Sequence, residues 1–304
     1  MRTRFPPDRG LVTRMLLTMF FLGLLYVIFI AVLIGALGQA WPVAILVAGG
    51  FFVVQYYFSD RIALFAMRGR EVSPDQAPEL HGMVDRLCVL ADMPKPRVAI
   101  ADTDVPNAFA AGRSPQRAVV CVTSGMLRRL DASELEGVLA HELSHVAHSD
   151  VAVMTIASFL GVLAGIITRF GLQFGMLGGR GRRGSQDNNT FVAFLLVLVV
   201  STLVYAVSFL LIRALSRYRE LSADRSGALL TGKPSSLASA LTKITGEMGR
   251  VPTRDLRQAE PFNAFFFTPA LAEGFSLSSL FSTHPSLPRR LDQLGRISVE
   301  LGRG

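Results

Sequence analysis

The chain has 304 residues, and half of them are hydrophobic, which is too apolar for an ordinary soluble domain. A mean hydropathy of +0.41 likewise predicts a membrane protein. The net charge of +8 has a local explanation, because much of the arginine lies beside apolar segments. Anionic lipid headgroups are therefore expected partners, and no nucleic-acid-binding motif is present. Cys88 and Cys121 lack metal-type spacing, so both are expected to be buried thiols.

Two apolar segments lie near the N-terminus. No charged residue separates Arg14 from Asp60, and a short break divides this run into residues 15–37 and 42–58. Each segment is long enough to cross about 30 Å of hydrocarbon as a helix. The arginines that precede the first segment place the N-terminus in the cytoplasm by the positive-inside rule. A cleavable signal peptide is the alternative for the first segment, although its apolar core is long and a second segment follows at once.

The next region, up to residue 150, is soluble in character. Its apolar periodicity predicts a helix over residues 78–92. Three short strand-like runs follow, at residues 97–101, 107–111 and 118–122. A turn at residues 112–116 joins the last two runs. We therefore expect a small sheet that lies beside the helix described next.

Residues 131–150 contain the motif H-E-x-x-H, formed by His141, Glu142 and His145. Two histidines four residues apart lie on one face of a helix, so both imidazoles can reach a single zinc ion. The glutamate between them then points at a water in the open metal position. The alternative interpretation is a chance pair of surface histidines.

The motif stretch is predicted to be helical on independent grounds. Asp131 and Glu134 have the spacing of a capping box, which marks a helix N-terminus. Apolar residues then recur at helical spacing, namely Leu135, Val138, Leu139 and Val146. The histidine motif therefore lies in the secondary structure that its chemistry requires.

Two further apolar segments follow, at residues 151–177 and 191–215. Arg169 interrupts the first of them, and the polar patch between them, residues 178–190, is rich in arginine. These features leave two interpretations open. The hairpin either crosses the membrane fully or lies partly in the interface.

Glu220 is a candidate third metal ligand. His145 lies six residues before the third apolar segment and Glu220 about eight after Ile212, so both stand about 9–12 Å from the same membrane face. A His/His/Glu set leaves a fourth position for water. Two alternatives remain: an ion pair of Glu220 with Arg217 or Arg225, or His148 as the third ligand. Three ligands from one unbroken helix give poor tetrahedral geometry, so His148 is expected to lie outside the ligand set.

A sheet edge beside the metal can hold a peptide substrate extended by main-chain hydrogen bonds. The candidate edge is Asn107, Ala108, Phe109 and Ala110. A plain hairpin without a substrate role is the alternative interpretation.

Several motifs together resemble the HtpX family of membrane-bound zinc metallopeptidases. They are P-N-A-F-A at 106–110, L-A-H-E-L-S-H-V-A at 139–147, R-E-L-S-A-D at 219–224 and S-T-H-P-S at 282–286. The resemblance covers nearly the whole chain. It departs from the family where Asn-Gly usually precedes the equivalent of Asp150, because this chain has His148-Ser149.

The resemblance implies one zinc ion per chain, with His141, His145 and Glu220 as ligands and Glu142 as the catalytic glutamate. Asp224 would orient a ligand histidine. His284 is a further candidate, either to stabilise the oxyanion or to orient the substrate, with a packed loop residue as the alternative.

The expected fold is mainly helical with a small β-sheet: a multi-pass membrane protein with a gluzincin-like protease domain. The expected parts are a two-helix anchor at 1–59, a first protease segment at 60–150, a membrane hairpin at 151–215 and a second protease segment at 216–304. The expected function is cleavage of misfolded membrane proteins at the cytoplasmic face of the bacterial inner membrane. The alternatives are an intramembrane protease and a non-catalytic scaffold or chaperone that retains a zinc site.

Overall fold

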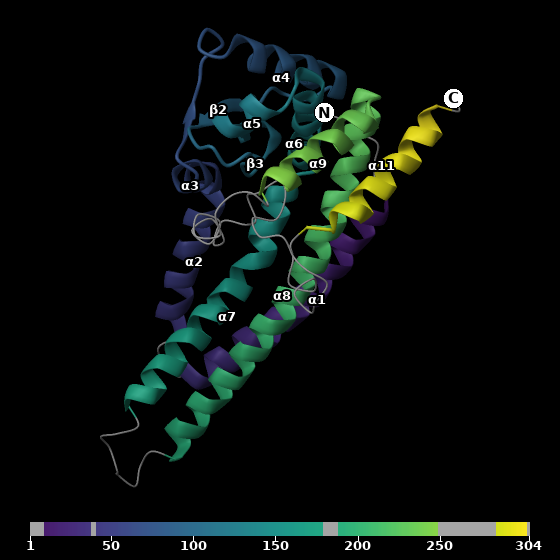
Figure 1. The fold of residues 1–304 in the computed structure, drawn as a ribbon. Helices are drawn as coiled ribbons and strands as arrows, with labels where there is room; N and C mark the ends of the chain where they lie inside the picture. Colours follow the sequence, from purple (N-terminus) through teal and green to yellow (C-terminus); the bar gives the residue numbers. More distant parts are fainter. Residues whose placement is uncertain (1–8, 38–40, 179–187, 249–283, 303–304) are drawn as a thin grey trace.

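The computed structural model describes residues 9–37, 41–178, 188–248 and 284–302. Figure 1 shows a long helical bundle that carries a compact mixed domain at one end. The predicted fold class, mainly helical with a small sheet, is confirmed. Two aromatic-rich segments of the sequence, at 262–267 and 275–281, lie outside the described residues.

The sheet has four strands in the order β1-β2-β4-β3. The parallel pair β2 and β4 forms its centre, while β1 and β3 are antiparallel edge strands. The strands are β1 (Gly69–Glu71), β2 (Arg97–Ala101), β3 (Ala108–Ala111) and β4 (Val119–Thr123). The predicted strands are therefore confirmed to within about one residue. A short 3-10 turn, η2 (Pro115–Arg117), lies within the β3–β4 connection.

Helices cover both faces of the sheet. All five residues of β4 are buried, as expected for a central strand with helices on each side. One face packs into the main core with α4 and α6, and the other face packs on Ala63 and Leu64 of α3. The helices of this domain are α3 (Ser59–Ala66), α4 (Pro78–Ala91), α5 (Ser124–Arg129), α6 (Ala132–Ala147), α9 (Pro234–Met248) and α11 (Leu287–Leu301).

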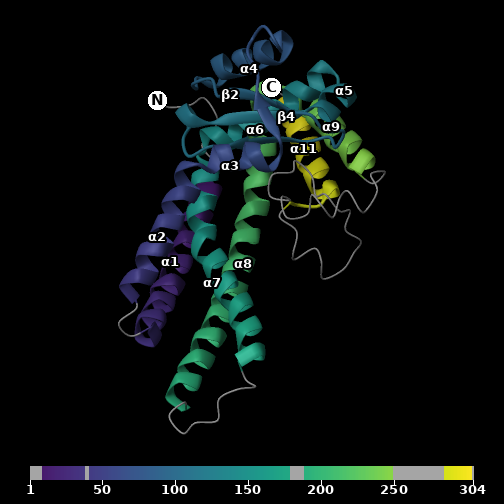
Figure 2. The same ribbon diagram turned by 90° about the vertical axis from the view of Figure 1, so that its left-hand side faces the viewer.

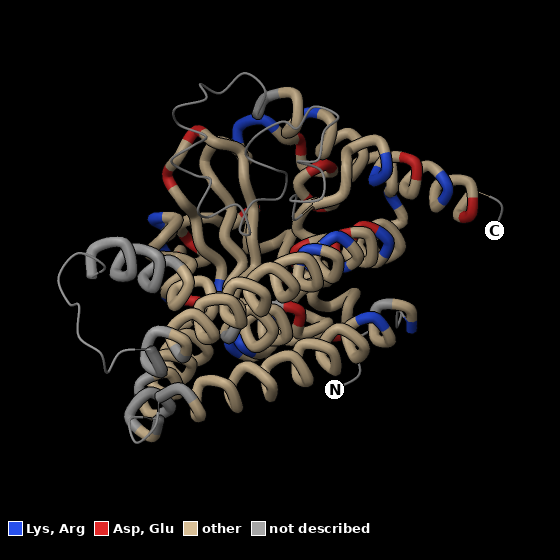
Figure 3. The backbone as a smooth tube through the Cα atoms, turned by 90° about the horizontal axis from the view of Figure 1, so that it is seen from below, with Lys and Arg blue, Asp and Glu red and all other residues tan. Residues whose placement is uncertain are grey.

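Four long apolar helices form the bundle, and Figures 1 and 2 show them side by side below the sheet. They are α1 (Arg9–Leu37), α2 (Trp41–Tyr57), α7 (Asp150–Gly178) and α8 (Asn188–Thr231). Figure 3 shows few charged residues along them. Two stretches, Val12–Gly35 and Phe194–Thr231, are long and apolar enough to cross a membrane. A third candidate for a membrane-spanning segment is present if α6 and α7 are counted as one bent span. The expected four membrane crossings therefore stay a prediction.

Small residues allow α7 and α8 to pack closely. A Cβ atom at Gly161 would lie 3.0 Å from Ser208, and one at Gly165 would lie 2.9 Å from the Tyr205 ring. The Tyr26 hydroxyl of α1 donates a hydrogen bond of 2.7 Å to the backbone oxygen of Ala157. Close backbone approach and interhelical hydrogen bonds are the interactions that hold helices together in lipid, where hydrophobic burial gives no advantage.

Helix α6 ends at the point where the sequence departs from the family pattern. Ser149 has φ 55, in the left-handed region that Gly and Asn adopt more easily than serine. The chain turns there by 61° and continues directly as α7. The H-S pair at 148–149 therefore still ends the helix, at the cost of a serine in a strained conformation.

Helices α6 and α8 meet in an unusually close contact at Gly227. A Cβ atom at this position would lie 2.9 Å from the backbone nitrogen of His141. Glu220 and Asp224 lie seven and three residues before Gly227, and therefore on nearly the same face of α8. The glycine thus brings the acidic face of α8 against the histidine face of α6.

Replacing Gly227 with alanine should force α6 and α8 apart. The new Cβ would come closer to His141 than real Cβ atoms do, and overpacking of this kind typically costs about 1–3 kcal/mol in the free energy of unfolding. Thermal unfolding of the detergent-solubilised protein measures this loss.

Gly295→Ala in α11 is a matched control, since a Cβ there meets nothing within 4 Å. Alanine is favoured over glycine inside a helix by up to about 1 kcal/mol, so this variant should be as stable as the wild type or slightly more stable. Unchanged stability of Gly227→Ala would contradict the close-contact explanation.

Candidate active site

Helix α6 presents the three motif residues, and its start is fixed as the sequence predicted. The backbone N–H of Glu134 donates to Asp131 at 2.9 Å, and the backbone N–H of Asp131 donates to Glu134 at 3.0 Å. This capping box sets the helix register, which places His141, Glu142 and His145 in a buried position. The helix packs between the sheet, α8 and α9, so its motif face lies inside the protein rather than in lipid.

Helix α8 brings Glu220 to the two histidines. Its Oε2 atom lies 3.6 Å from Nε2 of His141, and its Oε1 atom lies 3.4 Å from Nε2 of His145. One ligand atom from each of the three residues lies within 4.8 Å of the other two. The predicted group is thus assembled from both sides of the α7–α8 hairpin.

These distances fit a bound metal ion. In a tetrahedral site with bonds of about 2.0–2.1 Å, neighbouring ligand atoms are separated by roughly 3.3 Å. Both separations from Glu220 are close to this value. Two imidazole nitrogens and one carboxylate match the donor set of zinc peptidases and leave a fourth position open.

Asp150 and Arg219 hold the imidazole of His145. The Nδ1–H group donates to Asp150 Oδ2 at 2.7 Å, which directs Nε2 toward Glu220. The Nε atom of Arg219 in turn lies 2.9 Å from the same oxygen. A carboxylate on the second nitrogen is the usual way in which a ligand histidine is oriented.

His141 has the same arrangement with residues from different helices. Its Nδ1 atom lies 2.9 Å from Oδ1 of Asp224, the partner that the resemblance implied. Arg290 of α11 donates two hydrogen bonds to that carboxylate, at 2.7 Å from Nε and 2.6 Å from Nη2. The C-terminal helix therefore contributes directly to the order of the site.

The metal-free site favours protonated histidines. Burial by itself lowers the pKa of His145, but hydrogen bonds with Asp150 and Glu220 outweigh it and raise the pKa to about 10. The pKa of His141 is also raised, because its contacts with Asp224 and Glu220 outweigh the effect of burial. The site is therefore electrostatically suited to positive charge.

Glu142 lies beside His141, His145 and Glu220 and near strand β3. Burial raises the pKa of its carboxyl group against the opposing effect of His141 and His145, and the backbone N–H of Ala110 lowers it by hydrogen bonding. A raised carboxyl pKa suits a group that accepts and later returns a proton near neutral pH.

The expected substrate edge is an edge strand of the sheet, because β3 pairs only with β4 in the described residues. The side chains of Ala108 and Phe109 pack into the apolar clusters on the two faces of the sheet. Phe109 packs with the cluster on the α3 face, and Ala108 packs into the main core. Asn107 is fully buried, and its backbone N–H donates to Thr123 at 2.9 Å. Any contact of β3 with a substrate would therefore be made by its main chain, of which the Ala110 N–H already donates to Glu142.

The other residues that the sequence suggested for the site, His284, His148 and Arg225, lie in different places relative to the converging group. The Nδ1 atom of His284 lies 3.0 Å from Oε2 of Glu220, so His284 contacts the converging group through Glu220. His148 caps the end of α6 and is not part of the converging group. Arg225, one expected ion-pair partner of Glu220, instead lies 3.7 Å from Glu300.

Sequence reasoning missed three residues of the site: Asp150, Arg219 and Arg290. A signal for the first was present, because each ligand histidine requires a partner on its second nitrogen. Only Asp224 had been assigned, and Asp150 is the acidic residue five positions after His145. Arg290 gave no comparable signal, since its distance from Asp224 depends on how α11 packs.

The chain matches proteins of known classification. The model of peptidase family M48 matches residues 74–298. The chain is 61% identical over 302 residues to protease HtpX homolog 1 of Streptomyces coelicolor, covering 99% of this chain and 97% of that protein. It is 54% identical over 301 residues to the protease HtpX homolog of Moorella thermoacetica, covering 99% of each.

Among solved structures, the crystal structure of S. mikatae Ste24p is similar, with a TM-score of 0.53 and 19% sequence identity. The match covers 91% of this chain and 64% of the Ste24p chain, and it supports the fold of a membrane metalloprotease. With the family match and the two close relatives, it follows that the chain belongs to peptidase family M48, as a member of its HtpX family.

Proposed function

We propose that the chain is a zinc-dependent endopeptidase that cleaves polypeptides beside the membrane. The observation that carries the proposal is the buried group of His141, His145 and Glu220, with the Glu142 carboxylate next to it. Membership of a peptidase family supports hydrolysis of peptide bonds.

The two imidazole Nε2 atoms and the Glu220 carboxylate would hold one zinc ion. A bound zinc ion supplies Lewis-acid activation of water and of the scissile carbonyl. Asp150 and Asp224 hold the imidazoles with their Nε2 atoms toward the site. His284 contacts Glu220, so we assign it the orientation of that ligand. A role for His284 toward the substrate oxyanion stays a prediction.

Glu142 would act as the general base and then as the general acid. Its carboxylate accepts a proton from the attacking water and returns it to the leaving amine. The hydrogen bond from the Ala110 N–H keeps the carboxylate close to β3, where a scissile bond would lie. No covalent acyl-enzyme is required.

The outer edge of β3 would hold the substrate as an added antiparallel strand. Its main-chain groups on the side away from β4 have no strand partner within the described residues. Recognition through main-chain hydrogen bonds depends little on side chains, and therefore suits a protease with many substrates.

We further propose that all four bundle helices cross the bacterial inner membrane and that the site faces the cytoplasm. The arginines at the N-terminus support this orientation. Substrates would be misfolded membrane proteins or their cytoplasmic loops. Glu134 and Glu136 of the motif helix form ion pairs with Lys243 of α9 and Arg86 of α4. These charged contacts lie within the mixed domain that contains the sheet, which argues against an intramembrane protease.

The first test compares wild type with Glu142→Gln and Glu220→Ala in detergent, measuring metal content and cleavage of casein. Glu142→Gln should keep the metal and lose activity by about 10²–10⁴-fold, the usual range for removing a general acid or base. Glu220→Ala should lose both metal and activity.

Glu300→Ala, an exposed acidic residue in α11, is the control and should behave as wild type. If wild-type protein binds zinc but does not exceed the background of Glu142→Gln, the non-catalytic scaffold or chaperone becomes the better explanation.

Removing the carboxylates behind the histidines should weaken metal binding. Asp150→Asn and Asp224→Asn should each lower the affinity for zinc by about 10–100-fold, because the imidazoles lose their orienting partners. Competition with a chelating dye measures this affinity without reference to activity. Asp292→Asn, which alters an exposed ion pair with Arg296, should leave it unchanged. If Asp150→Asn and Asp224→Asn bind zinc as tightly as the wild type and Asp292→Asn, these carboxylates only stabilise the fold.

Metal binding should release protons. Because the pKa of His145 is about 10 in the metal-free protein, its imidazole is protonated at pH 7, and a metal ion must displace that proton. The affinity for zinc should therefore fall as the pH falls. Calorimetric titration at pH 7 in buffers of different ionisation enthalpy measures the number of protons released. Zero release would mean that the histidines are neutral before the metal binds.

A further inference from the structure

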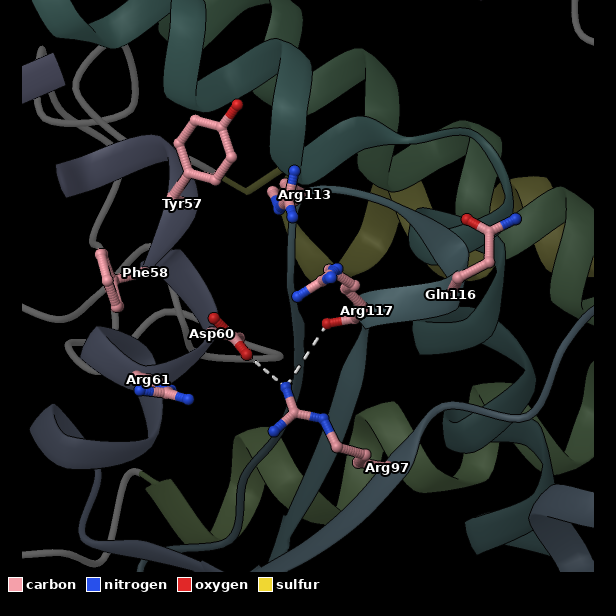
Figure 4. Close-up of a pocket in the computed structure, with 8 residues that line it drawn as sticks. All are labelled: Tyr57, Phe58, Asp60, Arg61, Arg97, Arg113, Gln116 and Arg117. Atoms are coloured by element: carbon pink, nitrogen blue, oxygen red, sulfur yellow. Dashed lines mark hydrogen bonds and ion pairs between the residues drawn. The ribbon is translucent and has the colours of Figure 1, made fainter. Parts of the chain in front are cut away.

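A second site lies on the opposite face of the sheet from the proposed metal site. It is a pocket of about 640 Å³ between the end of α2, the start of α3 and the β3–β4 connection. Figure 4 shows its lining residues. Four of them are arginines: Arg61, Arg97, Arg113 and Arg117. Pockets of this size accommodate small ligands and headgroups.

The strand periodicity explains how one of these arginines reaches the pocket. Alternate residues of β2 point to opposite faces, and Ala99 and Ala101 pack on the α3 side. Arg97 shares their parity, so its guanidinium emerges on that side, where it pairs with Asp60 and Glu71. It also lies 3.5 Å from the backbone oxygen of Arg117. Arg97 is therefore neutralised and holds the pocket wall together.

The other three arginines leave an excess of positive charge. Arg113 lies over the Tyr57 ring at 4.4 Å, and Arg61 lies 5.7 Å from the centre of the Phe58 ring. No carboxylate pairs with Arg61, Arg113 or Arg117 in the part of the chain that the structure describes. Among the described residues, the one acidic side chain that lines the pocket is Asp60, which already pairs with Arg97. The pocket is thus built to receive an anion.

The position of the pocket identifies the source of that anion. A stripe of exposed apolar side chains runs along the end of α2 and through α3: Val54, Phe58, Ile62 and Phe65. Phe65 is 86% exposed, which is unfavourable in water but not at a lipid surface. Phe58 belongs to both the stripe and the pocket wall. The pocket therefore opens beside the surface that we place against lipid, at the depth of the headgroups.

We propose that this pocket binds the phosphate group of an anionic membrane lipid. The guanidinium groups of Arg61, Arg113 and Arg117 match phosphate oxygens in geometry and charge. The aromatic rings of Tyr57 and Phe58 lie where the glycerol backbone and the first part of the acyl chains would pass. Because Arg113 lies two residues after the end of β3 in the sequence, a bound headgroup would also stabilise the position of that strand end.

The test measures binding of tail-labelled fluorescent lipids to the full chain in a neutral detergent. Wild type should bind phosphatidylglycerol at least about fivefold more tightly than phosphatidylcholine with the same chains. Arg61→Gln/Arg117→Gln should weaken phosphatidylglycerol binding by about 25-fold, taking about fivefold for each arginine near an anionic headgroup. Binding of phosphatidylcholine should weaken by a smaller factor, because its choline cation offsets the charge of the same phosphate group.

The control is Arg128→Gln/Arg296→Gln, which removes the same charge from two exposed arginines on α5 and α11. It should bind both lipids as wild type does. Equal loss in the control, or equal binding of the two lipids by wild type, would overturn the proposal. If the double variant does not elute and unfold as wild type does, the single variants replace it, with an expected loss of about fivefold each.

Two competition experiments, with inorganic phosphate and with an acidic peptide, distinguish a lipid ligand from other anions. Millimolar inorganic phosphate should not displace labelled phosphatidylglycerol, because it lacks the apolar contacts of the stripe. Displacement by phosphate, or by an acidic peptide at a lower concentration than unlabelled phosphatidylglycerol, would identify a different ligand and reject the lipid assignment.

Discussion

The buried contact between α6 and α8 is the constraint on which the site depends. The ligand group requires one face of each helix to meet at a fixed rotation, and each residue step along a helix turns a side chain by about 100°. Gly227 sets this register, because only a residue without a side chain lets α8 approach the backbone of His141 so closely. A slip of one residue along α8 would turn Glu220 away from both histidines. The remaining parts of the domain, the sheet that packs on α6 and helix α9 beside it, hold that contact in place.

The balance of charge explains why so many ionisable groups can be buried together. Four carboxylates are buried at the site, those of Glu142, Asp150, Glu220 and Asp224, and they meet two buried arginines, Arg219 and Arg290. With neutral histidines the cluster carries two uncompensated negative charges, which is costly in a protein interior. A divalent cation removes this cost. Without a metal the same cost is reduced by protonating the histidines, in agreement with the raised pKa of His145, about 10.

Local features of the fold could be predicted from sequence, whereas long-range contacts could not. The capping box of Asp131 and Glu134, the strand Arg97–Ala101 and the helix that starts at Pro78 all follow from short-range patterns, and the structure places them as expected. The grouping of Glu220 with the histidines was expected from their similar distances from the ends of the two apolar segments and from the resemblance to the HtpX family. By contrast, the pairing of Arg290 with Asp224 joins residues 66 positions apart and depends on the docking of α11. The basic pocket was missed for the same reason, since its arginines come from separate elements that only the sheet brings together.

Helix α8 runs without a break from the apolar bundle to the candidate active site. This helix has 44 residues and a length of roughly 66 Å, so one rigid element contains both the apolar part and the acidic residues of the site. Glu220 lies five residues beyond Leu215, the last residue of the expected apolar segment, which places the ligand roughly 7–8 Å further along the helix. A shift or tilt of α8 in the bilayer would therefore move Glu220 relative to α6. Helix α3, with its exposed apolar side chains, lies at the same end of the bundle as α6, so the proposed lipid pocket and the proposed metal site share that end.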